Sequence, residues 1–77
     1  MKTGSGSVQI LERRFEIFPS KFSWRGRIYR VDAVNECKTT THRQGIQATF
    51  HYWVRCDDQL FHLKEVVPSG HWSVHPQ

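Results

Sequence analysis

The sequence predicts an all-β domain, folded as a strongly curled antiparallel meander of five or six strands. Turn signals rich in Gly, Pro, Asp and Ser recur about every 8 to 12 residues. Between them, apolar and polar residues alternate with the period of two that is typical of a strand with one buried face. No segment demands a helix longer than two turns. These observations favour an SH3-like or half-open barrel.

The first structured segment, Val8 to Phe18, fits two descriptions. One is a strand with a break near Arg13 and Arg14, and the other is a short helix toward its C-terminal end. Pro19 is expected to end the segment in either case, because proline cannot donate a hydrogen bond to a strand ladder.

A hairpin is expected next. Residues 22–24 form its first strand, and Arg25 with Gly26 forms a tight turn. The second strand is predicted to run from residue 27 to about residue 37. Near Ala33 the apolar residues switch from one face of this predicted strand to the other, which indicates a bulge or strong bend there.

Three further strands and their connections complete the predicted sheet: a polar loop over 38–45, a strand over 46–56, a turn at 57–59, a strand over 60–67, a turn at 68–70 and a strand over 71–75. The strand over 46–56 has the cleanest alternation. It places Tyr52 and Val54 on the inner side, and His51 and Trp53 on the outer side.

Length and charge limit the possible functions. We expect residues 1–7 to be a flexible leader and residues 8–77 to be a single small β domain, with little room for a deep catalytic cavity. The net charge is +4, and residues 21–31 and 38–55 contain no acid. This bias favours anionic partners such as nucleic acid, although lysine and arginine also serve solubility.

Cysteine and histidine spacing gives little support for catalysis or metal binding. Cys37 and Cys56 form no Cys-x-x-Cys pair and are in phase with the buried face, so we expect two reduced thiols in a cytoplasmic protein. His51 and His62 lie on neighbouring predicted strands, but no zinc signature accompanies them. We therefore expect no enzyme activity and no cofactor.

The candidate binding surface is basic and aromatic. It consists of six residues: Arg25, Arg27, His51, Trp53, Arg55 and Lys64. An exposed tryptophan among cations has the composition of a platform on which nucleobases stack. Two alternatives are open for Trp53, which is either exposed or covered by residues 8–18, whereas Trp24 and Trp72 are expected in the core.

Three short motifs carry a resemblance across residues 19–75: Phe22-x-Trp24-Arg25-Gly26-Arg27-x-Tyr29-x-Val31, Tyr52-Trp53-Val54-Arg55 and Gly70-x-Trp72-x-Val74-His75. With them the chain resembles a family of small bacterial proteins of unknown function, whose sequence also occurs at the C-terminal end of Y-family polymerase-like proteins from mutagenesis cassettes. This chain differs in having residues 39–45 in place of a tryptophan-rich loop, and Phe61-His62-Leu63-Lys64 in place of an acidic or tyrosine-containing strand. The resemblance implies a link to DNA-damage machinery.

Two functions follow as hypotheses. The first is a non-catalytic interaction module that binds single-stranded nucleic acid through the basic aromatic face, in a DNA-repair or mobile-element context. The second is a domain that docks a protein partner of the DNA-repair machinery at a sheet edge and does not bind nucleic acid. A homodimer that buries Trp53 would contradict the first hypothesis.

Overall fold

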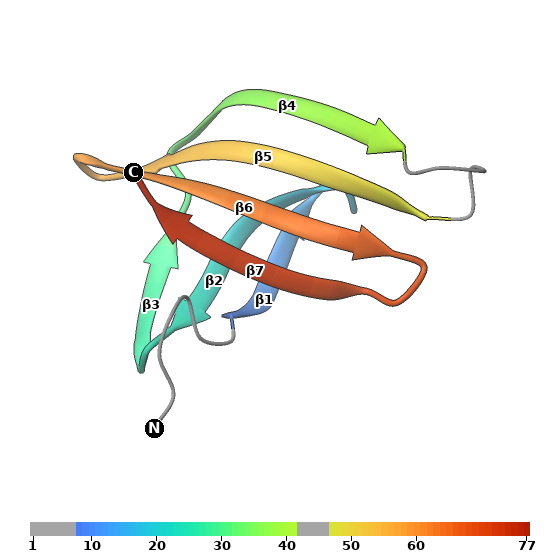
Figure 1. The fold of residues 1–77 in the computed structure, drawn as a ribbon. Helices are drawn as coiled ribbons and strands as arrows, with labels where there is room; N and C mark the ends of the chain where they lie inside the picture. Colours follow the sequence, from blue (N-terminus) through green and yellow to red (C-terminus); the bar gives the residue numbers. More distant parts are fainter. Residues whose placement is uncertain (1–7, 42–46) are drawn as a thin grey trace.

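A computed structural model describes residues 8–41 and 47–77 (Figure 1). These residues form seven antiparallel strands in two sheets: β1 (Val8–Arg14), β2 (Phe18–Trp24) and β3 (Arg27–Arg30) in one, and β4 (Ala33–Thr41), β5 (Ala48–Cys56), β6 (Gln59–Val67) and β7 (His71–Pro76) in the other. The all-β prediction is confirmed. The described part of the chain has seven strands rather than five or six, and no closed barrel forms from them. None of it is a helix long and apolar enough to span a membrane.

The N-terminal segment is a hairpin and contains no helix; the strand does break near Arg14, as the first description expected, but the break is a turn between two strands. β1 ends at Arg14, and β2 begins at Phe18 after a turn in which Phe15 and Glu16 have φ values of 58° and 59°. Pro19 does not end the segment, contrary to the prediction, but lies fully buried inside β2 opposite Arg13. The ladder shifts register just before this pair, and such an irregularity accommodates a residue without an N–H group.

The turn at Arg25 and Gly26 is confirmed. Both residues have positive φ, 53° and 77°, and Trp24 pairs with Arg27 across a two-residue turn. Because a glycine has no Cβ, it takes this left-handed conformation with little strain.

The single strand predicted over residues 27–37 is in fact two strands in different sheets. The Val31 N–H donates to the Ser20 carbonyl at 2.9 Å, and the Asp32 N–H donates to the Arg55 carbonyl at 2.8 Å. The connection is therefore hydrogen-bonded to both sheets at the point where the chain crosses between them. A register shift follows between Val34 and Glu36, near the predicted bend.

β4 also extends further than the sequence indicated. The predicted loop over 38–45 is wrong for residues 38–41, which continue β4 and pair with β5; the rest of that loop lies outside the described residues. Thr39, Thr40 and Thr41 are β-branched and suit an extended backbone. Polarity alone was therefore a poor indicator of a loop.

The core lies between the inner faces of the two sheets, whose strands run across one another (Figure 1). Phe22 of β2 and Phe61 of β6 are fully buried and meet edge to face, with ring centroids 5.5 Å apart. Trp24 also packs edge to face on Phe61, at 6.0 Å, so its predicted core position is confirmed. Such aromatic pairs add to the hydrophobic stabilisation that comes from burial.

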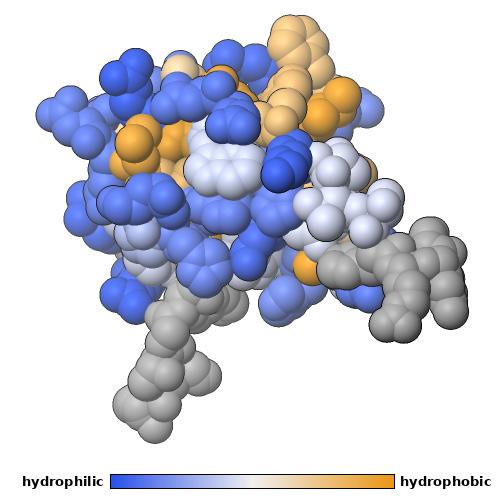
Figure 2. Space-filling model, turned by 45° about the horizontal axis from the view of Figure 1, so that its top comes forward, coloured by the Kyte–Doolittle hydropathy of each residue, from blue (hydrophilic) through white to orange (hydrophobic). Residues whose placement is uncertain are grey.

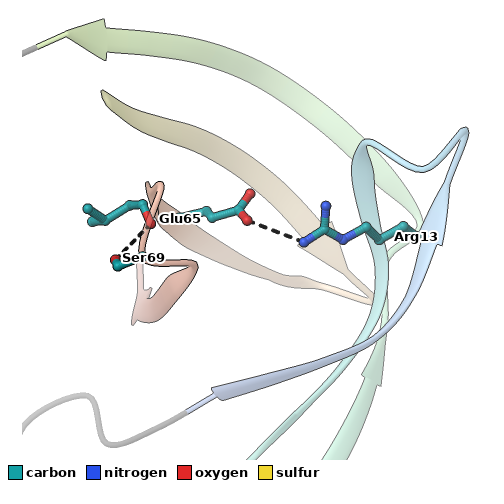
Figure 3. Close-up of polar contacts among 4 residues, drawn as sticks. Arg13, Glu65 and Ser69 are labelled. Carbon is teal, nitrogen blue, oxygen red and sulfur yellow. Dashed lines mark hydrogen bonds and ion pairs between the residues drawn. The ribbon is translucent and has the colours of Figure 1, made fainter. Parts of the chain in front are cut away.

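An ion pair joins the sheets beside this core. Arg13 reaches from the β1–β2 hairpin to Glu65 of β6, with Nη2 and Oε2 3.4 Å apart (Figure 3). The Arg13 guanidinium also lies 5.3 Å from the ring centroid of Trp72 on β7. Glu65 is buried, and its charge is therefore compensated across the sheet interface.

The two cysteines differ, although both were predicted on the buried side. Cys56 is buried, and burial, with the nearby carboxylates of Asp32 and Asp57, raises its pKa to about 11. Cys37 opposes the inner residue Tyr52, yet it is exposed. The inner side of β4 is hollowed into a groove lined in part by Cys37 and Phe18, so an inward-pointing residue of this edge strand is left open to solvent.

Candidate nucleic-acid interface

The outer face of the four-stranded sheet carries two rows of polar and aromatic side chains. Residues directly opposite one another in an antiparallel ladder point to the same side. One row is Glu36, Trp53, His62 and His75, and the next is Lys38, His51, Lys64 and Ser73. Seen obliquely from the side of β4, the molecule has a largely hydrophilic surface with near-neutral side chains among the blue ones (Figure 2).

Three rings on this face lie nearly parallel to one another, and two of them, Trp53 and His62, stack face to face. His62 lies opposite Trp53 with ring centroids 4.4 Å apart and planes inclined by 12°. His51 lies 5.6 Å from Trp53 and 5.1 Å from His62, again with nearly parallel planes. His51 Nδ1 and His62 Nε2 are 2.9 Å apart and share a hydrogen bond, while His51 Nε2 lies 3.3 Å from the Thr40 hydroxyl. These contacts fix the orientation of the rings.

Trp53 is half-buried, and the segment over residues 8–18 does not cover it. That segment lies in the other sheet, and its Arg13 contacts Glu65 and Trp72 on the inner side of the four-stranded sheet. The partial burial of Trp53 is instead due to its own sheet, where His62 and His51 stack beside it. Trp72, predicted in the core, is half-buried and stacks on Tyr52 at 5.9 Å.

Desolvation and the neighbouring positive charges favour the neutral forms of His51 and His62 by lowering the pKa of each. Desolvation lowers the pKa of His51, and the positive charges of Lys64 and Lys38 lower it further. Desolvation also lowers the pKa of His62, followed by the effects of His51, Lys64 and His75. A neutral pair can share one proton in its N–H···N bond, whereas two imidazolium rings would repel each other.

Four of the six predicted site residues come together here, and two do not. His51, Trp53 and Lys64 lie in the two rows, and the exposed Arg55 lies next to them on β5 opposite Leu60. Arg25 and Arg27 belong to the β2–β3 hairpin of the three-stranded sheet.

The two hairpin arginines pack on aromatic rings of their own sheet. The Arg25 guanidinium lies 4.6 Å from the ring centroid of Trp24, and that of Arg27 lies 5.4 Å from Tyr29. The single six-residue face is therefore corrected to a four-residue cluster on one sheet. Sequence alternation gave the side of each strand but did not show that the chain changes sheets at residues 31–32.

Lys38 is a member of the site that the sequence interpretation missed. It was assigned to a loop, but it lies on β4 opposite His51. Glu36, Lys38 and Thr40 are each two residues apart, and residues with this spacing lie on one face of a strand. Extending the strand through residue 40 would therefore have placed Lys38 on the same face as Glu36.

The described residues include no group of three or more His, Cys, Asp or Glu side chains positioned to hold a metal ion. His51 and His62 do approach each other across the sheet as a pair, but their facing nitrogens bond to one another. The arrangement presents a stacking surface flanked by cations.

Comparison with known proteins gives no relative: no protein-family model, no curated protein sequence and no solved structure matches this chain.

Proposed function

We propose that this domain is a non-catalytic module that binds single-stranded nucleic acid on the outer face of its four-stranded sheet. The observation that carries the proposal is the stacked pair of Trp53 and His62, with His51 hydrogen-bonded to His62, beside the cations Lys38, Lys64 and Arg55. Stacking of a base on such a surface is sequence-tolerant, because every base has a π-face.

The two groups have separate roles in the proposed complex. A nucleobase extends the ring stack at Trp53, and the adjacent phosphates lie over Lys38, Lys64 and Arg55. Single strands fit better than a duplex, because their bases are free to leave their own stack. The DNA-repair or mobile-element context rests only on the motif resemblance, and it is part of the proposal.

Salt dependence provides the first test. Three phosphate contacts predict a slope of log K against log [salt] of about −2 for a single strand, since each contact contributes about −0.7. The affinity for a labelled oligo(dT) is then expected to fall about 20-fold between roughly 50 and 200 mM NaCl. Fluorescence anisotropy at several salt concentrations measures this slope, and a slope near zero would refute the proposal.

Variants separate stacking from charge. Trp53→Ala is expected to weaken binding by about 1–3 kcal/mol, while Trp53→Phe retains much of the affinity. Lys64→Ala should reduce the magnitude of the salt slope by about 0.7. Arg30→Ala is the matched control, because Arg30 is an exposed cation of the other sheet. Equal losses in Arg30→Ala and Lys64→Ala would indicate general charge attraction in place of a site.

A second function, docking of a protein strand at a sheet edge, is supported by the outer edge of β4, which pairs with no other strand among residues 8–41 and 47–77. If nucleic acid does not bind at any salt concentration, this function is the one that the fold supports.

A further inference from the structure

β4 is the longest edge strand of the described fold. It has nine residues, most of them exposed, and within the part of the chain that the structure describes it pairs only with β5. The other edges are blunted in ways that natural sheets commonly use. β7 ends in Pro76, β3 has four residues, and the pairing of β1 with β2 is irregular at two places. Beyond its bulge, β4 contains no proline from Glu36 to Thr41.

The sequence of this edge is complementary to itself. Glu36 and Lys38 lie on the outer face, on either side of the inward-facing Cys37. If a second β4 pairs antiparallel about a two-fold axis at Cys37, Glu36 of each copy opposes Lys38 of the other. Two cross-strand ion pairs form on one face of the joined sheet, and opposite charges at such positions stabilise pairing.

An apolar groove runs along the inner side of the same strand. Its volume is about 520 Å³, and it is lined among others by Phe15, Phe18, Pro19, Val34 and Cys37. Phe15 is 77% exposed and Ile17 is 52% exposed at the tip of the β1–β2 hairpin. Orange and tan side chains also gather at the upper margin of Figure 2.

A two-fold axis perpendicular to the sheet keeps the inner sides of both copies on the same side. The groove and hairpin tip of one copy then lie beside those of the other. Pairing can therefore bury exposed apolar surface and also give hydrogen-bond partners to the backbone groups of the β4 edge.

We propose that the occupant of this edge is a second copy of the chain, and that two β4 strands pair about Cys37 to form a continuous eight-stranded sheet. The inference does not rest on nucleic-acid binding, although Lys38 takes part in both proposals, because it is argued from the β4 edge and its readout is the mass of the protein. In such a dimer both ring stacks lie on the same side of the joined sheet.

Charge reversal tests the register. Sedimentation equilibrium from micromolar to millimolar concentration is expected to give a mass approaching twice 9.1 kDa for the wild-type chain. Lys38→Glu and Glu36→Lys each place like charges opposite one another, and each should raise the dimer dissociation constant at least about tenfold. The double swap Glu36→Lys/Lys38→Glu restores complementary pairs, as does an equimolar mixture of the two single variants. Far-UV circular dichroism confirms that each variant is folded.

Cys37 provides a second readout. In the proposed dimer the two Cys37 thiols oppose each other, and diamide can oxidise them to one disulfide by accepting both hydrogens. Cys56 is buried with a raised pKa, so it should not react. Wild-type protein should give a covalent dimer on a non-reducing gel, and Lys38→Glu should give far less. A monomer at millimolar concentration, or a dimer that both single reversals leave intact, would overturn the proposal.

Discussion

Replacing Arg13 by methionine is expected to weaken the attachment of the two sheets. The methionine keeps part of the aliphatic contact but removes the charge that compensates Glu65, whose side chain is only 12% exposed. At the observed 3.4 Å, the Coulomb attraction is about 5 kcal/mol at an effective dielectric constant of about 20 and about 1 kcal/mol in bulk water. The Arg13 side chain is 37% exposed, so solvent screening brings the expected loss to about 2 kcal/mol.

A double-mutant cycle with Glu65→Gln isolates the pair from the packing of Arg13. Urea unfolding followed by circular dichroism gives the free energy of unfolding of each variant. Glu65→Gln should cost less than Arg13→Met, because the charge that it leaves without its partner, on Arg13, is more exposed to solvent than the carboxylate of Glu65. The double variant should recover part of the Arg13→Met loss. Arg14→Met, at an exposed neighbouring site, should change stability by no more than about 0.5 kcal/mol. A coupling energy of zero would refute the proposed role of the ion pair.

Three further changes test other parts of the fold by the same unfolding assay. Gly26→Ala should cost about 1 kcal/mol, because φ is +77° there while the added Cβ meets no neighbour within 4 Å; an unchanged stability would contradict the turn geometry. Leu63→Ala should cost about 2–5 kcal/mol as a fully buried side chain, whereas a similar loss for Leu60→Ala, 42% exposed, would contradict the assigned faces. The pKa of His51 and His62 is lowered in the folded state, so their contribution to stability is present above the unfolded value of 6.5 and is lost as the pH falls through the folded pKa. The urea midpoint should therefore drop from pH 8 to pH 5, and a variant with glutamine at both positions should lose this part of the drop.

Local pattern was sufficient for the strands with one buried face. The alternation around Tyr52 and Val54 correctly placed His51 and Trp53 on the outer side, because the period of two follows from backbone geometry alone. The tight turn at Gly26 was predicted for a similar reason, because a glycine between two β-prone segments indicates a turn without any information on distant contacts, and its φ is 77° in the structure.

Features set by distant contacts were not predictable in this way. The transfer of the chain between sheets at residues 31–32 depends on the Ser20 and Arg55 carbonyls, which are far apart in sequence. The same transfer separates Arg25 and Arg27 from the outer-face cluster. Such contacts are tertiary, and single-sequence propensity contains little information about them. The meeting of His51 and His62 differs, because the alternation already placed the two histidines on neighbouring strands where they could meet, and the short Asp57-Asp58 turn sets the register of β5 and β6 that brings them together.

The central claim is that Trp53 and its neighbouring rings contact a nucleobase. The most direct measurement uses Trp24→Phe/Trp72→Phe, in which Trp53 is the remaining tryptophan of the chain. Its emission is followed while oligo(dT) is added at low salt and again at high salt. The proposal predicts that the oligonucleotide quenches Trp53 at low salt and that added salt reverses the quenching. Emission that stays unchanged while the protein remains folded, with no binding detected by anisotropy, would contradict it.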